Sequence, residues 1–113
     1  MEVNPKLIDV LNGLSIWKVK DISDEPETFL TQWSVWKVDD ETIHFVGWAG
    51  YEGRVCSAVQ SYDPKTKCGI TKSGRIYKLQ GEPGHNWDAL HVWNAWKRIN
   101  HVVNAEEITQ SFV

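Results

Sequence analysis

The chain has 113 residues, 42% of them hydrophobic and 24% charged, which is typical of one folded domain and unlike a disordered chain. Its net charge of −3 gives no overall case for binding nucleic acid or an anionic membrane. No apolar run approaches the ~20 residues of a membrane span, and the first residues lack a signal-peptide pattern. We therefore expect a cytoplasmic, single-domain protein over residues 1–113, with reduced cysteines and no membrane partner.

The first expected element is a short N-terminal helix over residues 5–12. Asn4 is a good N-cap, and Pro5 suits the first helical position. Gly13 then supplies a C-terminal stop.

Strands are expected next at 15–22, 29–38 and 42–48. The second of them has apolar residues on both faces, with Phe29, Trp33 and Val35 on one and Leu30, Trp36 and Val38 on the other. Such a strand is either buried on both sides or leaves one side for a partner.

Two turn signals divide the following stretch into an antiparallel meander with strands at 55–62, 67–72 and 75–80. The sequence Asp-Pro-Lys-Thr at 63–66 favours a type I turn, and Ser-Gly at 73–74 favours a second tight turn.

These turns imply a register, and side chains alternate between the two faces of a strand. If Asp63 pairs with Thr66 and Lys72 with Arg75, the expected core face carries Val55, Val59, Cys68, Ile70, Tyr77 and Leu79. Lys72 and Arg75 then lie opposite each other, which is unfavourable unless an anion binds to them. A bulge at Gly74 would shift this register by one residue.

A tryptophan-rich helix follows, capped by Asn86 or Asp88 and ending at Asn100 or His101. Its apolar stripe is expected to contain Ala89, Val92, Trp93, Trp96 and Ile99. The tail after residue 104 fits either a further helix or a last strand. The expected fold is therefore α+β: a short N-terminal helix, an antiparallel sheet of five to six strands with a C-terminal β-meander, and a Trp-rich helix packed on one face.

Charge is divided unevenly along the chain. Residues 21–52 contain eight acids and one base, whereas residues 54–80 contain six bases and one acid. The simpler interpretation is that the two segments are neighbouring strands that neutralise each other.

An anion site is one candidate binding site. The free N–H groups at the start of the Trp-rich helix favour negative charge, and basic residues precede them on the meander. The candidate ligand-binding residues are Lys72, Arg75, Lys78, His85 and Asn86. With stacking on aromatic rings, such a site would suit a nucleotide or single-stranded nucleic acid. The alternative is an ordinary loop with solvated lysines.

Protein–protein contact is the other candidate. Seven Trp are more than so small a core needs, and Trp and Tyr are common interface anchors. Trp33, Trp36 and Tyr51 are the candidate interface residues, facing another protein or a second copy in a homodimer. No metal, cofactor or catalytic residue is expected, because the cysteines and histidines lack zinc-site spacing and no catalytic motif is present. We leave an enzyme open but do not favour it.

The stretch from Thr71 to Gly84, with Asp88-Ala89, Val92-Trp93, Trp96 and Asn100 after it, resembles a pattern in small uncharacterised phage and prophage proteins. The resemblance covers roughly a quarter of the chain and assigns no functional residue. It implies an accessory protein that binds or inhibits a host component. The leading expectation is thus a binding protein that contacts a protein partner, followed by a nucleotide or nucleic-acid binder and then an enzyme.

Overall fold

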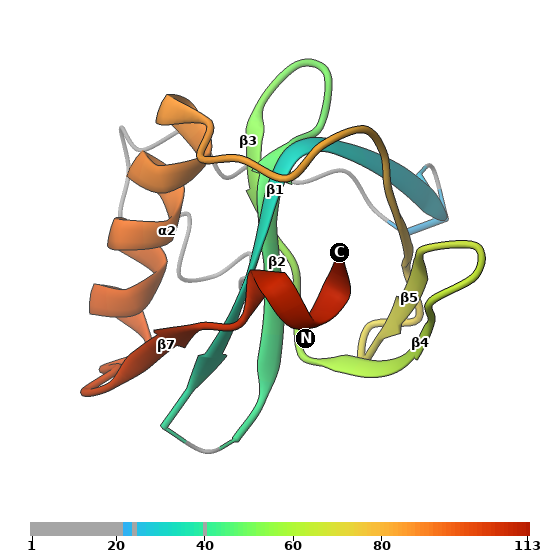
Figure 1. Ribbon diagram of the computed structural model, residues 1–113. Helices are drawn as coiled ribbons and strands as arrows, with labels where there is room; N and C mark the ends of the chain where they lie inside the picture. The colour runs from blue at the N-terminus through green and yellow to red at the C-terminus, as the bar shows by residue number, and fades with distance from the viewer. Residues whose placement is uncertain (1–21, 24, 40) are drawn as a thin grey trace.

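The computed structural model describes residues 22–23, 25–39 and 41–113 (Figure 1). The helix expected at 5–12 lies outside these residues, as does all but the last residue of the strand expected at 15–22.

The described chain forms seven strands, one α-helix and one 3₁₀-helix. In chain order these are β1 (Glu27–Val38), β2 (Ile43–Trp48), β3 (Gly53–Val55), β4 (Val59–Asp63), β5 (Cys68–Thr71), β6 (Ile76–Leu79), α2 (Trp87–Ile99), β7 (Ala105–Glu107) and η2 (Thr109–Phe112). The strand order across the sheet is β3-β2-β1-β6-β5-β4, with β7 also paired to β1.

The expectation of an antiparallel sheet with five to six strands is wrong, because the sheet is mixed and has seven strands. β1 pairs with β6 in parallel, whereas its other partners, β2 and β7, are antiparallel to it. Turn residues in the sequence predict only the hairpins between strands that follow one another in the chain. The β1–β6 pairing joins distant parts of the chain, and alternation within a strand does not reveal its partner's direction.

A bend in β1 divides the sheet into two halves. The register with β2 shifts between Thr31 and Ser34, and Gln32 takes a left-handed backbone conformation with φ 47°. Before the bend β1 pairs with β6, and after it with β2 and β7. The halves fold toward each other, since a Cβ at Gly69 of β5 would lie 2.6 Å from the Phe45 ring of β2.

Two apolar clusters form on opposite sides of β1 and β2. The inner cluster lies between the sheet halves and contains Leu30, Trp33, Val35, Phe45, Cys56, Tyr77 and Leu79. The outer cluster joins Val38, Val46 and Val55 to the buried face of α2, which supplies Ala89, Val92, Trp93, Ala95 and Trp96. Burial on both sides was one of the two interpretations of the apolar strand at 29–38. It holds for the part of the strand after the bend, whereas Phe29, before the bend, is exposed.

Helix α2 begins at an N-cap, Asn86, whose side-chain oxygen accepts a 2.9 Å hydrogen bond from the Ala89 N–H. The helix contacts β2 and β3. Its approach to β3 is close because Gly53 has no side chain: a Cβ there would lie 2.6 Å from the Ala89 Cα. In Figure 1, α2 lies on one side of β1, β2 and β3, and β4 and β5 lie on the other side of the molecule.

The meander is present, but its register differs from the expected one. Asp63 pairs with Cys68 rather than Thr66, which leaves a four-residue loop. At the second turn the Thr71 N–H donates to the Arg75 carbonyl, and Gly74 has φ 93°. This is the three-residue loop with a left-handed glycine that favours a bulge.

The register shift exchanges the two faces of β5. Ile70, expected in the core, is 45% exposed, whereas Gly69 and Thr71 are buried. Tyr77 and Leu79 of β6 remain in the core, as expected. A shift of one residue has this effect because side chains alternate along a strand.

The tail forms both a strand and a helical turn. Asp39, directly after β1, binds the loop between α2 and β7. Its carboxylate accepts hydrogen bonds from the Val103 and Asn104 N–H groups at 2.6 and 2.5 Å. Phe112 of η2 packs edge-on against Phe45, with ring centroids 6.0 Å apart, and closes one end of the inner cluster.

Candidate functional site

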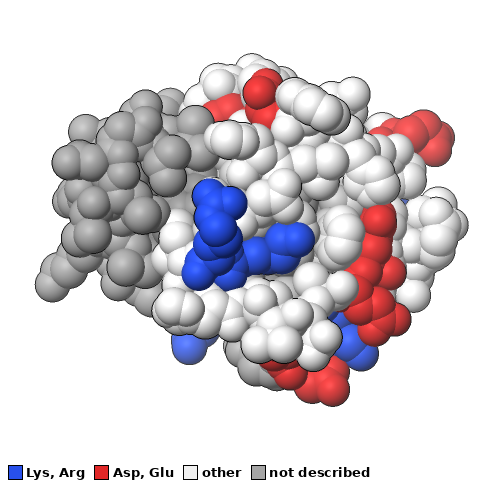
Figure 2. All heavy atoms as spheres, turned by 90° about the vertical axis from the view of Figure 1, so that its left-hand side faces the viewer, with Lys and Arg blue, Asp and Glu red and all other residues white. Residues whose placement is uncertain are grey.

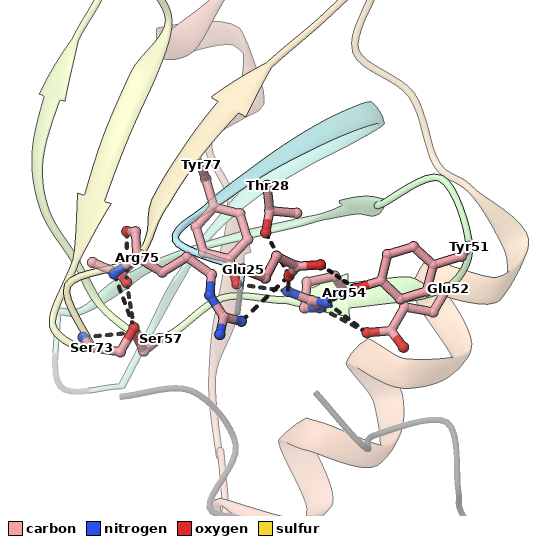
Figure 3. Close-up of polar contacts among 10 residues, drawn as sticks. Glu25, Thr28, Tyr51, Glu52, Arg54, Ser57, Ser73, Arg75 and Tyr77 are labelled. Carbon is pink, nitrogen blue, oxygen red and sulfur yellow. Dashed lines mark hydrogen bonds and ion pairs between the residues drawn. The ribbon is translucent and has the colours of Figure 1, made fainter. Parts of the chain in front are cut away.

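A cluster of charged side chains is buried where β1, β3 and β6 begin or end (Figure 3). Arg54 and Arg75 are each only 1% exposed, and their guanidinium groups approach Glu25 from two sides. Arg54 Nη1 lies 3.0 Å from Glu25 Oε2, and Arg75 Nη1 lies 3.7 Å from the same oxygen. Arg54 also donates from Nε and Nη2 to Glu52 Oε2 at 2.9 and 2.8 Å. Two cations and two anions therefore balance.

Hydroxyl groups complete the cluster. The Tyr51 hydroxyl donates to Glu25 and accepts from Arg54 Nη2 at 2.9 Å. The Thr28 hydroxyl donates to Glu25 Oε2 at 2.8 Å. The cluster thus connects the residue before β1 with the β2–β3 loop and the start of β3.

The pKa directions show what this cluster can do. Burial alone would raise the pKa of Glu25, but hydrogen bonds from Tyr51 and Thr28 and the charge of Arg54 lower it below the usual value. Burial and the hydrogen bond to Glu25 raise the pKa of Tyr51 to about 12. Burial also raises the pKa of Glu52, against the opposing charge of Arg54. An ionised Glu25 accepts a hydrogen bond from the neutral Tyr51 hydroxyl beside its ion pair with Arg54, an arrangement that is not a proton-transfer pair suited to neutral pH.

The same contacts explain the uneven charge along the chain. Glu25 and Glu52 belong to the acidic stretch, and both meet Arg54 of the basic stretch. Glu27 of β1 likewise lies 3.4 Å from Lys78 of β6. For Glu25, Glu27 and Glu52, the acidic and basic segments are neighbours whose charges pair, which agrees with the simpler interpretation.

The expected basic residues do not converge on one site. Arg75 is buried beside Glu25, whereas Lys78 points to the opposite face of β6 and pairs with Glu27. Lys72 is exposed at a groove that His44 and Trp96 also line. Lys72 and Arg75 no longer face each other, because the Gly74 bulge shifts the register.

The two remaining anion-site candidates serve other contacts. His85 Nε2 lies 2.8 Å from a Glu107 carboxylate oxygen. Asn86 caps α2 through its side-chain oxygen and donates from Nδ2 to Gln32 Oε1 at 2.8 Å. His85, just before α2, therefore already contacts the carboxylate of Glu107, and the first turn of the helix is capped by Asn86.

The three expected interface residues have different environments. Trp33 is fully buried in the inner cluster, and its Nε1 donates to the Gly81 carbonyl at 3.2 Å. Trp36 is half-buried, with its ring centroid 5.5 Å from that of Trp93. Tyr51 is half exposed, although its hydroxyl belongs to the ion cluster. Among the tryptophans that the structure describes, the most exposed is Trp87 at the start of α2, at 87%, which the sequence did not indicate.

A surface with exposed apolar residues is the outer face of the sheet half formed by β1, β6, β5 and β4, which we call the open face. Its outward-pointing residues form two cross-strand rows. One row is Glu27, Ile76, Ile70 and Ser61, and the other is Phe29, Lys78, Cys68 and Asp63. Phe29 is 47% exposed and Ile70 45%. A groove on this face is lined by Ile70, Ile76 and Cys68 together with charged and polar neighbours.

Sequence reasoning missed the open face because it placed Ile70 in the core and left open whether the face of the strand with Phe29 is buried or meets a partner. The bend at Gln32 separates Phe29 from the buried Trp33, and the Gly74 bulge turns Ile70 outward. A signal was present in the Ser73-Gly74 sequence, which suits the three-residue loop as well as the two-residue one.

The side of the molecule that α2 presents is different in character. Figure 2 shows basic side chains meeting near the centre of that side and carboxylates along its edge. The last turn of α2 carries Lys97 and Arg98, which complement the helix dipole. The charge of this side is mixed, and the exposed Trp87 lies at the start of α2.

Two classes of site find no support in the part of the chain that the structure describes. No group of three or more His, Cys, Asp or Glu there is placed to hold a metal ion. No described helix is long and apolar enough to cross a membrane. Comparison with protein-family models, curated proteins and solved structures found no match. The resemblance to phage and prophage proteins therefore stays a prediction.

Proposed function

We propose that this protein is a binding protein without catalytic chemistry of its own, and that it contacts a protein partner through the open face. The observation that carries the proposal is the exposure of Ile70 and Phe29 on a four-strand surface that no described helix covers. A clustered apolar surface of this kind favours contact with another protein.

The energetics support a contact at this face. Burying an aliphatic or aromatic side chain completely contributes roughly 1.5–3 kcal/mol, so burying the exposed half of Ile70 or Phe29 contributes on the order of 1 kcal/mol each. Glu27, Lys78 and Asp63 surround the apolar residues with charge. Such a charged rim orients a partner more than it adds affinity.

The other features of the molecule favour this surface over a ligand pocket. The buried ion cluster is charge-balanced, and the five candidate anion-binding residues are dispersed. A flat apolar face without converging polar groups suits a protein better than a small ligand.

The test compares the native size of the tagged protein after brief chemical cross-linking in the cells that carry its gene, so that a contact that dissociates readily is retained. We expect the wild-type protein to elute well above its own mass of 13.0 kDa, and Ile70→Glu to elute as a single chain. The matched control is His91→Glu, at an exposed position on α2. A wild-type protein that elutes as a single chain, or a complex that survives Ile70→Glu, would contradict the proposal.

A further inference from the structure

We propose that the partner seated on the open face is a second copy of this chain, so that two sheets stack face to face about a two-fold axis. This inference rests on the proposed function and adds the identity of the partner. It comes from the positions of charged and apolar residues in the two rows of the open face.

The second row has the symmetry that a two-fold contact requires. Cys68 lies on β5, Lys78 lies one strand away on β6, and Asp63 lies one strand away on β4. Opposite charges thus flank β5 at equal spacing, about 4.8 Å on either side. A two-fold axis along β5 places each Lys78 over the Asp63 of the other copy.

The first row is compatible with the same axis. Ile70 lies on β5 and would stack on Ile70 of the second copy, while Ile76 would meet the small Ser61. Aligned sheets pack in this way with a separation of about 10 Å. The contact is isologous, because both copies use the same face: Lys78 of each copy meets Asp63 of the other, and residues of β5 on the axis meet their own counterparts.

Lys78 and Asp63 are both able to pair with the opposite charge on a second copy. Within one chain, the Lys78 amine lies 3.4 Å from Glu27 in a partly exposed ion pair. Such a pair is weak, so the amine can also contact a carboxylate of the second copy. Asp63 accepts a hydrogen bond from the Lys65 N–H through one carboxylate oxygen. The second carboxylate oxygen of Asp63 can then accept a hydrogen bond from the Lys78 amine of the second copy.

The size of the face predicts a dimer that forms and dissociates readily. Three strands at about 4.8 Å spacing and strands about 15 Å long give roughly 200 Å² of planar contact. This is well below the ~800 Å² per partner of a standard stable interface. We therefore expect the dimer to form only at high protein concentration, so an assay for it has to capture the dimer covalently.

Cys68 supplies a chemical trap at the axis. It is half-buried on the open face, whereas Cys56 is fully buried in the inner cluster. A bis-maleimide that spans about 10 Å should join two Cys68 side chains, with a yield that rises with protein concentration. Cys68→Ser should remove the product, and peptide mapping should show Cys68 joined to Cys68.

Charge exchange tests the proposed pairing itself. Lys78→Asp places like charges across the axis, and Asp63→Lys does the same with the opposite sign. Each variant alone should associate on the order of tenfold more weakly than the wild type in sedimentation equilibrium. An equal mixture of the two should recover association, because the carboxylates of one variant then meet the amines of the other. Arg98→Asp, on exposed α2, is the control and should change nothing.

The possible results separate this inference from the proposed function. A purified chain that stays a single copy up to near-millimolar concentration, with a lysate complex that Ile70→Glu still abolishes, overturns the second copy and leaves another protein as the partner. A dimer whose association is unchanged by Lys78→Asp uses a different face and also overturns the inference. Recovery in the mixture supports it, and circular dichroism verifies that each variant is folded.

Discussion

Replacing Arg54 is the sharpest test of how the two halves of the sheet are joined. Its guanidinium group makes two hydrogen bonds to Glu52, at 2.9 and 2.8 Å, and one to Glu25 at 3.0 Å. It also donates to the Tyr51 hydroxyl. In Arg54→Leu, two carboxylates keep their partly buried positions and lose their main cation.

The expected loss of stability is large. Removing one partner of a buried ion pair costs about 3–5 kcal/mol, because an uncompensated charge remains. Arg75, 3.7 Å from Glu25, still compensates one carboxylate, so we expect a value near the lower end, about 3 kcal/mol. Domains of this kind have roughly 5–15 kcal/mol of total stability, so the variant should still fold. Arg54→Lys keeps the charge without the forked geometry and should lose about half as much.

The loss should also depend on pH, with a definite sign. The folded-state pKa of wild-type Glu25 is lowered, so its contribution is complete above the usual 4.5 and is lost as pH falls through the folded value. In Arg54→Leu the carboxyl pKa values rise, so that variant regains stability as the groups take up protons. The difference between the two proteins should therefore shrink from neutral pH to about pH 3.

Urea unfolding followed by tryptophan fluorescence measures these differences. Arg98→Leu, an exposed arginine on α2, is the matched control and should change stability by less than about 0.5 kcal/mol. An Arg54→Leu loss below about 1 kcal/mol, or a loss that does not change with pH, would refute the account of the cluster as a buried salt link.

Three further substitutions test local features of the fold by the same unfolding assay. Gly53→Ala places a Cβ 2.6 Å from the backbone of Ala89 and should cost about 2–3 kcal/mol, whereas Gly84→Ala, with its nearest neighbour at 3.7 Å, should be nearly neutral. Asn86→Ala removes the α2 cap and should cost about 1 kcal/mol; an unchanged midpoint would count against the cap. Asp39→Asn should cost about 1–2 kcal/mol and speed hydrogen exchange at residues 103 and 104; unchanged exchange there would disprove the carboxylate's role.

The parts of the fold that depend on local sequence were predictable. Asn86 caps α2 as its side-chain chemistry indicates, and Val92, Trp93 and Trp96 face the core as their spacing indicates. Two meander strands, β5 and β6, also form where the turn residues place them, whereas only the second half of the strand expected at 55–62 lies in β4. Each of these features depends on residues that are near one another in the chain.

The parts that depend on distant residues or on one-residue shifts were not predictable in the same way. The parallel pairing of β1 with β6 joins strands about 50 positions apart, and nothing in either strand specifies it. The bulges at Gln32 and Gly74 each turn an apolar residue, Phe29 or Ile70, to the surface. For this reason the proposed protein contact lies on the open face and not at the expected interface residues Trp33, Trp36 and Tyr51.

The claim that the open face is the contact surface can be tested most directly by photo-cross-linking in cells. A photoreactive amino acid at Ser61, which points outward beside Ile70, should form adducts with protein, and the proposed dimer predicts adducts of twice the 13.0 kDa chain mass. The same group at His91 on α2 should form none. Absence of protein adducts at Ser61, or equal labelling at both positions, would contradict the account.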